Sequence, residues 1–548
     1  MTILSDKRSR HIVPRWRSSL TAAGSRDLDP LKRGAARKVD GVPAAVRQQL
    51  AEFTSDPSIG TAADALATAI SAGHPEIALP AAAFIQQHAD EAPRFLAEIA
   101  SASLDGLGVP LGLEVPVGTQ AAIARLRGLL RIYPRSATMW ADLARYQAAT
   151  GDIEKSKRSM RVSLSLAPDH RWVLRSANRL LLHAGDFRQA HHMLASHRRT
   201  REDPWLMAAE IASAQLMQVT PKFLSRGREL LRHPTFQTIH LSELATAVAT
   251  SDIDGGQRKS ARRLLRIAMK DPTENALAQI EWADHKADDG LHVIQTVNRM
   301  PDAFEAAFWV KRQEGQIIDA YRAAQAWMAD EPFADAPIGA AAHCAALLDE
   351  YDEIVRITNI GLSRDSGNLL HRNNQVFALI SSGRVWEDDA EFERIAQFLS
   401  GRVASPGLDM IQVAANIGLL LYRAGQLDDG AMFYRRAIEL ADRHAGTVTA
   451  AQAAAYHLRE AALARAPWVN EALEVARNHA KRANDGVANF LMRKLEDLVR
   501  RPHMANEIFG ASAAARYLPR AGRNVAADLK VTMTESGPVL VVPAHLLR

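Results

Sequence analysis

The chain contains few residues that form covalent or metal cross-links. Its 548 residues include one cysteine, Cys344, and only 6% of them are aromatic. A single thiol excludes an internal disulfide and a cysteine-rich zinc module.

No run of 18 apolar residues occurs, which excludes a membrane-spanning helix. The N-terminus lacks the apolar core of a secretory signal. We therefore expect a cytoplasmic protein without a membrane partner, and the Ala- and Arg-rich composition favours a bacterial origin.

Catalytic and cofactor motifs are also lacking. The sequence has no GxxxxGK[ST], no GxGxxG after a strand, no HExxH and no GxSxG. Cys344 is preceded by His343, but neighbours on a helix do not face each other, so we expect a buried thiol. The histidines at 191, 192 and 197 lack acids or cysteines at ligand spacing. The sequence therefore predicts a protein that is not an enzyme and holds no metal or cofactor.

The positive charge is concentrated at the N-terminus. Residues 1–38 hold ten Lys or Arg and three Asp, so this segment carries +7 while the whole chain carries +5. Such a segment is typical of a disordered arm, a solvated tail or a transit peptide. An arm of this charge also suits contact with nucleic acid or an acidic protein surface. The residues that would contact nucleic acid are Arg8, Arg10, Arg15, Arg17, Lys32, Arg33, Arg37 and Lys38.

Nearly all of the remaining chain has the pattern of helices. Apolar residues recur at spacings of three and four from about residue 44 to 500. Two β-branched runs around Gly537 predict a small C-terminal hairpin, which must pack on the helices or pair with another chain. The expected parts are a basic arm (1–40), an N-terminal helical region (41–104), a Gly/Pro linker (105–118), a helical array (119–445), C-terminal helices (446–500) and a basic segment with a β element (501–548).

The helical array contains an internal sequence repeat. Gly151 and Gly185 are 34 residues apart, as are Pro134 and Pro168. The best unit starts at Ala137, and a clear later unit starts at Ile411. The pattern resembles the tetratricopeptide repeat (TPR) family, whose 34-residue unit is a helix–turn–helix. In the best unit the matching residues are Trp140, Leu143, Ala144, Gly151, Met160 and Pro168, at positions 4, 7, 8, 15, 24 and 32.

The resemblance implies a groove lined by the first helix of each repeat. Arg175 and Arg179 are four residues apart and share a helix face. Because arginine forks bind carboxylates, the implied ligand is a peptide with an acidic segment or a C-terminal carboxylate. The implied partner-binding residues are Arg145, Trp172, Arg175, Arg179 and His183 in early units, and Asn373, Asn416, Tyr422 and Arg423 in later units.

The sequence thus predicts an all-α, right-handed helical-repeat solenoid that resembles TPR proteins, with a disordered basic arm and a short C-terminal β-hairpin. Its predicted role is a scaffold or adaptor that binds a protein partner in its groove, with regulation of a separate enzyme as one form of that role. The alternative is association with nucleic acid through the arm. On the scaffold interpretation, replacing Arg175 and Arg179 by alanine abolishes partner binding without unfolding the protein.

Overall fold

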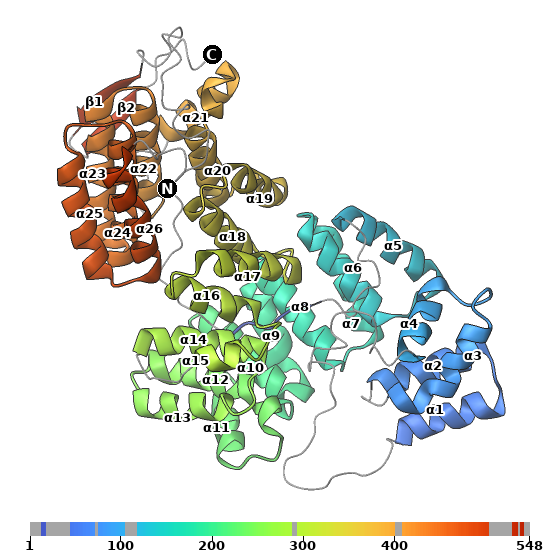
Figure 1. Cartoon of the computed structure of the whole chain (residues 1–548). Helices are drawn as coiled ribbons and strands as arrows, with labels where there is room; N and C mark the ends of the chain where they lie inside the picture. The colour runs from blue at the N-terminus through green and yellow to red at the C-terminus, as the bar shows by residue number, and fades with distance from the viewer. Residues whose placement is uncertain are drawn as a thin grey trace. The chain divides into compact units, whose positions relative to one another are not determined.

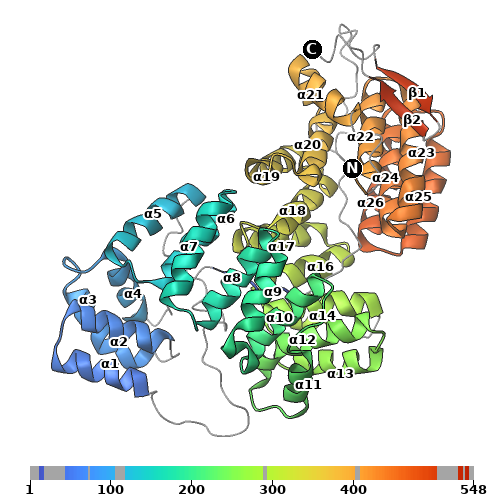
Figure 2. The same cartoon turned by 180° about the vertical axis from the view of Figure 1, so that it is seen from behind.

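The chain forms two compact units of packed helices. The computed structural model describes residues 12–17, 44–71, 75–104, 118–287, 293–400, 408–502, 529–534 and 537–541. Figures 1 and 2 show it from opposite sides. The N-terminal unit lies within Arg10–Val293 and also takes in Glu331–Phe333. The C-terminal unit lies within Ile294–Asp330 and Ala334–Arg548.

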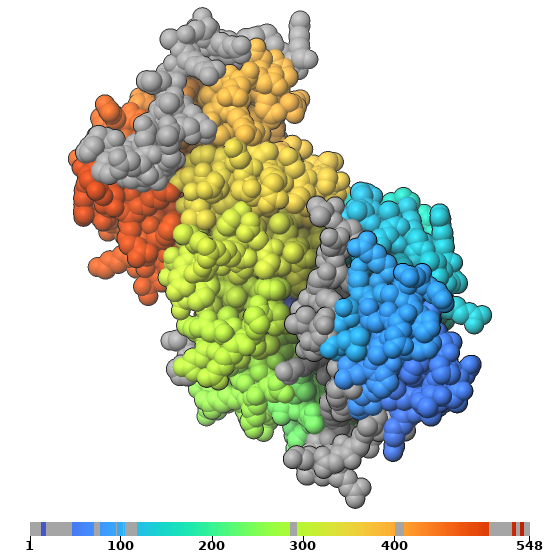
Figure 3. All heavy atoms as spheres, turned by 45° about the vertical axis from the view of Figure 1, so that its right-hand side comes forward, coloured from blue at the N-terminus to red at the C-terminus, as the bar shows by residue number. Residues whose placement is uncertain are grey.

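The N-terminal unit begins with a small helical bundle that has its own core. Val46, Leu66 and Ile85 are almost completely buried in that core. Figure 3 shows the bundle, in blue, as a filled mass of side chains. Its elements are α1 (Ala44–Ser55), α2 (Ile59–Ser71), η2 (Pro75–Ala78), α3 (Leu79–Gln87) and α4 (Arg94–Leu104).

The rest of the N-terminal unit is an array of helix pairs. The first helices α6, α8, α10 and α12 each pack on their own second helix and on the first helix of the next pair, so that α12 contacts α14. The array contains α5 (Thr119–Ile132), α6 (Ala137–Ala149), α7 (Ile153–Leu166), α8 (Arg171–His183), α9 (Phe187–Ser196), η3 (Arg198–Arg201), α10 (Pro204–Leu216), α11 (Leu224–Arg232), α12 (Thr238–Asp254), α13 (Arg258–Ala268), α14 (Glu274–Ala287) and, at the boundary of the units, α15 (Val293–Val297).

Local chemistry explains where these helices begin and end. The Ser136 hydroxyl accepts a hydrogen bond from the Met139 amide and caps the start of α6. Gly151 and Gly185 end their first helices with φ near +78° and +77°, a conformation that glycine adopts without strain. The 34-residue spacing of these glycines in the sequence is therefore the spacing of two equivalent turns, which confirms the helix–turn–helix repeat.

The C-terminal unit is also built of helix pairs, which pack around one hydrophobic core. Turns with positive φ recur at Gly315, Asp349 and Gly383, again 34 residues apart. The elements are α16 (Phe304–Gln313), α17 (Ile317–Asp330), α18 (Asp335–Leu347), α19 (Tyr351–Arg364), α20 (Leu369–Ser381), η4 (Arg384–Trp386), α21 (Asp389–Ser400), α22 (Leu408–Arg423), α23 (Leu427–His444), α24 (Thr447–Leu463), α25 (Val469–Ala483), α26 (Gly486–Arg500), β1 (Lys530–Thr534) and β2 (Gly537–Val541).

The clearest late repeat packs as its residue pattern predicts. In α22, a Cβ atom on Gly418 would lie 2.8 Å from the Tyr434 ring and 3.0 Å from the Gly430 carbonyl oxygen in α23. Real side-chain carbons essentially never come as near as 2.8 Å, so α22 and α23 pack this tightly only because both crossing positions are glycine. The small residue at position 8 of the repeat therefore serves close helix packing.

The two C-terminal strands form the predicted hairpin, and it packs on its own chain. β1 and β2 are antiparallel, with Val531 opposite Leu540. The Leu540 side chain is 1% exposed, and β2 contacts α21 and α23. The Gln426 amide nitrogen donates to the Leu529 carbonyl at 3.1 Å. Burial against these helices supplies the support that an isolated hairpin lacks.

The expected disordered arm has structure at one place. Residues 12–17 form no helix or strand, and Ile12, Arg15, Trp16 and Arg17 are at most 6% exposed. Composition predicts disorder for this segment because it has few apolar residues of its own, but the repeat array supplies the apolar and acidic surroundings. The rest of the arm, up to residue 40, and linker residues 105–117 lie outside the described residues.

None of the helices in the described part of the chain combines the length and hydropathy needed to cross a bilayer.

Candidate functional site

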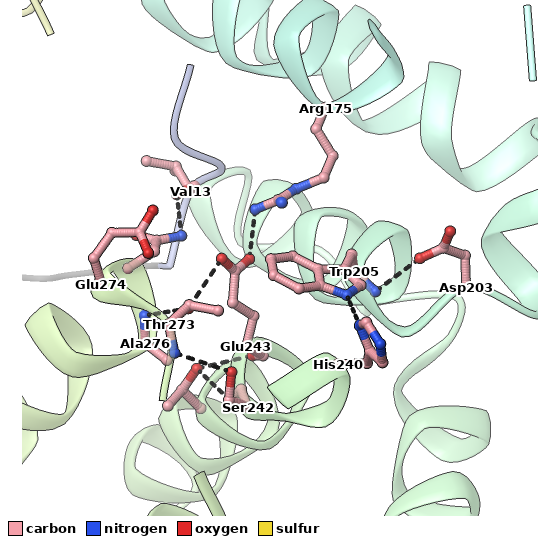
Figure 4. A network of polar contacts seen from close by, with 12 residues as sticks. Val13, Arg175, Asp203, Trp205, His240, Ser242, Glu243, Thr273, Glu274 and Ala276 are labelled. Atoms are coloured by element: carbon pink, nitrogen blue, oxygen red, sulfur yellow. Dashed lines mark hydrogen bonds and ion pairs between the residues drawn. The ribbon is translucent and has the colours of Figure 1, made fainter. Parts of the chain in front are cut away.

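The segment 12–17 is held against first helices of the N-terminal unit through its main chain. The side-chain amide of Asn275, at the start of α14, donates to the Val13 carbonyl at 2.8 Å. The Nε of Arg145, in α6, donates to the Trp16 carbonyl at 2.9 Å. Figure 4 shows Val13 beside the start of α14. Two side chains from separate helices thus bind main-chain carbonyl groups of the segment, and these two contacts do not depend on its side chains.

The two arginines of the segment meet two carboxylates. Arg15 forms an ion pair with Glu331, and Nη1 of Arg17 lies 3.2 Å from a carboxylate oxygen of Glu274. The side chains of both arginines are 7% exposed, so these pairs lie largely out of water. Removing one partner of such a pair leaves an uncompensated charge, so the pairing selects positive residues at both positions.

The tryptophan between the arginines fills an aromatic site. Trp16 is fully buried, and its ring centre lies 5.1 Å from that of Phe333 at an interplanar angle of 50°. The ring centres of Phe333 and His183 lie 5.4 Å apart at an interplanar angle of 73°, and the Arg179 guanidinium lies 5.0 Å from the centre of the Phe333 ring. The Trp16 indole N–H has no hydrogen-bond acceptor among the described residues. The site therefore binds the ring by apolar and π contacts.

We name this surface the docking face. It gathers residues from α6, α8, α14 and the connection between α17 and α18, which belongs to the N-terminal unit. Its residues are Arg145, Arg179, His183, Glu274, Asn275, Glu331 and Phe333.

A buried polar network lies next to the start of α14, which carries Glu274 and Asn275 of the docking face (Figure 4). Arg175 in α8 donates to Glu243 in α12 at 2.7 Å, and its guanidinium lies 4.6 Å from the centre of the Trp205 ring. The Thr273 hydroxyl donates to the other Glu243 oxygen at 3.3 Å and accepts from the Ala276 amide at 3.1 Å. The network therefore fixes the first turn of α14.

The electrostatics of Glu243 show what Arg175 contributes. Complete burial raises the pKa of the Glu243 carboxyl, and the nearby carboxylate of Glu274 adds to that rise. The Arg175 guanidinium acts in the opposite direction and favours the ionised form. Arg175 therefore makes a buried carboxylate tolerable at this place.

The early set of predicted partner-binding residues divides into two groups. Arg145, Arg179 and His183 lie on the docking face, and one Arg179 Nη lies 3.4 Å from Glu331. Trp172 and Arg175 are each 1% exposed and lie in the interior of the N-terminal unit. Their role in partner binding stays a prediction, but neither offers surface to a partner in this structure.

Four residues of the docking face were missed by sequence reasoning: Glu274, Asn275, Glu331 and Phe333. The repeat frame slips between Gly256 and Gly315, and no repeat position marks the start of α14 within that interval. Glu331 and Phe333 follow the last residue of α17. The sequence signal that could have pointed to this site lies in the segment 12–17. There Arg15 and Arg17 flank Trp16, in an arm otherwise almost free of aromatic residues.

The later set of predicted residues lies inside the C-terminal unit. Asn373 and Asn416 are fully buried, and the Asn416 side chain donates to the Asn373 carbonyl at 3.1 Å. The Tyr422 hydroxyl accepts from the Trp468 indole at 2.9 Å, and Arg423 is 6% exposed. These contacts join one repeat to the next. Partner binding by this set stays a prediction, with no exposed surface in this structure to support it.

A second buried network spans the first helices of the C-terminal unit. Glu460 in α24 accepts from Arg423 at 2.9 Å and from Arg459 at 2.8 Å, and it is fully buried. Arg459 also lies 3.4 Å from Asp349 at the end of α18. Asp349 in turn forms an ion pair with Lys494 of α26. The last helix, α26, therefore packs on α24 and reaches the turn that follows α18.

Burial shifts the pKa values of titratable groups in the C-terminal unit. Burial lowers the pKa of His457, whose Nε2 lies 3.1 Å from the Tyr422 hydroxyl, to about 4. Burial raises the pKa of the Cys344 thiol to about 12, as expected of an unreactive buried cysteine. Within the described residues, no three His, Cys, Asp or Glu side chains gather where they would share a metal ion.

Comparisons with known proteins give remote structural likenesses. No family model and no curated protein matches the sequence. Yeast Tom70 is similar at 11% identity and a TM-score of 0.28, over 85% of this chain and 98% of Tom70. A human IFIT1 dimer with PPP-AAAA has 12% identity and a TM-score of 0.24, over 84% and 95% of the two chains. Naa15/Naa10 bound to HypK-THB has 12% identity and a TM-score of 0.20, over 79% and 69%.

These TM-scores are too low to carry an argument about function. The helix pairs and the 34-residue turn spacing of the chain itself establish a TPR-like helical-repeat fold.

Proposed function

We propose that this protein is a non-enzymatic helical-repeat scaffold that binds a protein partner as an extended peptide on the docking face. One observation carries the proposal: a segment without regular secondary structure, residues 12–17, already lies there with its backbone and side chains bound. Helical-repeat arrays suit this role because stacked repeats make a long continuous surface. Regulation of a separate enzyme by such a scaffold remains one form of the proposed role.

The chemistry of the docking face favours a basic and aromatic peptide. Glu274 and Glu331 face the arginines of the bound segment. Arg179 and Arg175, which suggested an acidic ligand, already face Glu331 and Glu243. The proposed ligand therefore differs in charge from the one inferred from the sequence.

The nucleic-acid alternative gains no support from the described residues. Arg15 and Arg17 are buried and paired with carboxylates, so neither presents its charge to phosphates in this structure. The other basic residues of the predicted nucleic-acid contact lie outside the described residues.

The proposal predicts a protein partner that depends on the two carboxylates. The full chain and a Glu274→Gln/Glu331→Gln variant are used to capture partners from a nuclease-treated lysate of the native host, with quantification by mass spectrometry. We expect a stoichiometric partner whose affinity falls by about ten-fold or more in the variant, because each lost buried charge contact costs about 1.4 kcal/mol or more.

A matched control keeps the charge change but moves it elsewhere. Glu154→Gln/Glu229→Gln removes two exposed carboxylates, with side chains 73% and 61% exposed, from the same unit. This control is expected to retain the partner. Equal capture by all three proteins contradicts the proposed function, as does capture of nucleic acid alone from a parallel lysate without nuclease.

A further inference from the structure

We infer that residues 12–17 are a displaceable ligand of the chain's own docking face, and that this face recognises peptides in which an aromatic residue stands between two arginines. The inference rests on the proposed function and adds to it the class of ligand and a means of regulation. A partner with this chemistry binds only after the segment 12–17 has left.

The contacts of the segment are those of a bound peptide. It has no hydrogen-bonded secondary structure of its own, and its partners come from α6, from α14 and from residues 331–333. Sequence separations of 129, 262 and 316 residues lie between the segment and these partners. The segment therefore contributes to no repeat, and the helix pairs pack on one another without it.

Three neighbouring residues of the segment determine which peptides the docking face accepts. Arg15 and Arg17 each face one carboxylate, and Trp16 between them is fully buried against Phe333. Because the Trp16 indole N–H finds no acceptor among the described residues, the ring contributes its apolar and π surface and no hydrogen bond. The face should therefore accept phenylalanine in place of tryptophan and reject alanine.

Covalent attachment makes the segment an effective competitor. A tethered ligand competes at an effective concentration on the order of millimolar, so even a weak intramolecular contact blocks a free peptide. The docking face is then closed in the isolated chain and opens to a partner that matches the segment and binds more strongly.

A binding experiment on the full chain tests the inference. The probe is a fluorescein-labelled peptide with the sequence of residues 10–19, followed by anisotropy. The proteins are the wild type and the full-length variant Arg15→Ser/Trp16→Ala/Arg17→Ser, which frees the face. We expect the variant to bind the probe at least about ten-fold more tightly than the wild type. A probe carrying Trp16→Phe should bind within about three-fold, and one carrying Trp16→Ala at least about ten-fold more weakly.

Two further variants test whether the probe binds at the docking face. Adding Glu274→Gln/Glu331→Gln to the freed variant should abolish binding, whereas adding Glu154→Gln/Glu229→Gln should not. A circular dichroism spectrum equal to that of the wild type and a cooperative urea transition show that the freed variant is folded, although its urea midpoint should be lower because the bound segment stabilises the folded state. A folded freed variant that does not bind the probe, or binds it no better than wild type does, overturns the inference.

Trypsin gives an independent readout of the same segment in the unmodified protein. Cleavage after Arg15 and Arg17 should be slow in the wild type and should accelerate at least about ten-fold when an excess of unlabelled, trypsin-resistant peptide displaces the segment. Unchanged cleavage rates overturn the inference. A partner that depends on Glu274 and Glu331 but is not displaced by the peptide also overturns it, while leaving the proposed function intact.

Discussion

Replacing Glu460 by alanine is expected to lower the free energy of unfolding of the C-terminal unit by about 3–5 kcal/mol. Glu460 is fully buried and accepts hydrogen bonds from Arg423 and Arg459, which are 6% and 3% exposed. Without the carboxylate, the two buried guanidinium groups lose the negative charge that they share. Arg459 still has its ion pair with Asp349, at 3.4 Å. Removing one member of a buried ion pair lowers stability by more than the intact pair contributes to it, because the remaining charge stays out of water.

The measurement is urea denaturation combined with hydrogen exchange, since a chain of this size need not unfold in one step. Peptides of α22 and α24 should lose protection first in the variant. The matched control is Glu474→Ala, which removes an exposed carboxylate paired with Arg477 in the same unit and should cost less than about 1 kcal/mol. A Glu460→Ala variant as stable as this control would show that the buried network does not hold the repeats together.

Replacing Arg175 by alanine should destabilise the N-terminal unit by a similar amount, about 3–5 kcal/mol. The change leaves the buried Glu243 carboxyl beside Glu274 and removes the guanidinium that stacks on Trp205. This differs from the expectation drawn from the sequence, in which Arg175→Ala with Arg179→Ala removes partner binding and leaves the fold intact. Arg175 is therefore unsuitable as a probe of binding, and the carboxylates of the docking face are better ones.

Two comparisons separate the charge effect from a general loss of packing. Arg226→Ala, which removes an exposed arginine paired with Glu229, should change stability by less than about 1 kcal/mol. Arg175→Met/Glu243→Leu removes both charges and should recover most of the stability lost in Arg175→Ala, because well-packed apolar residues often replace a buried ion pair without cost. If the double variant is less stable than Arg175→Ala, the proposed electrostatic cause is wrong.

The repeat frame was predictable from the sequence because its signals are local. A glycine with positive φ is needed at each turn, so Gly151 and Gly185 mark the repeat without knowledge of tertiary contacts. The tight packing at Gly418 follows from the same frame. The hairpin was predictable from its β-branched runs, and its packing on α21 and α23 decides between the two alternatives that the sequence left open.

The docking face was only half predictable. Their positions in the repeat place Arg145, Arg179 and His183 on the side of the first helices that lines the groove. Nothing in a repeat pattern indicates that a carboxylate 316 residues away pairs with Arg15. The composition of the arm predicts disorder because the apolar surface that buries Trp16 belongs to another part of the chain. Long-range pairing of this kind leaves no periodic trace in the sequence.

The later groove residues illustrate a different limit. Asn373 and Asn416 occupy positions that line a groove in the repeat frame, yet they are fully buried. Their side chains serve the packing between repeats, since the Asn416 amide donates to the Asn373 carbonyl at 3.1 Å. A position in the repeat frame does not indicate whether its polar side chain faces a ligand or the next repeat.

The most direct test of the account is a photo-crosslink from position 16. Trp16 is replaced in the full chain by p-benzoylphenylalanine, an aromatic residue that attacks neighbouring C–H bonds on irradiation, and crosslinked tryptic peptides are identified in the monomeric fraction. The account predicts intramolecular crosslinks to the peptides that contain Phe333 and Arg145. Crosslinks scattered over other helices, or none within the chain, would contradict the claim that the N-terminal segment occupies the docking face.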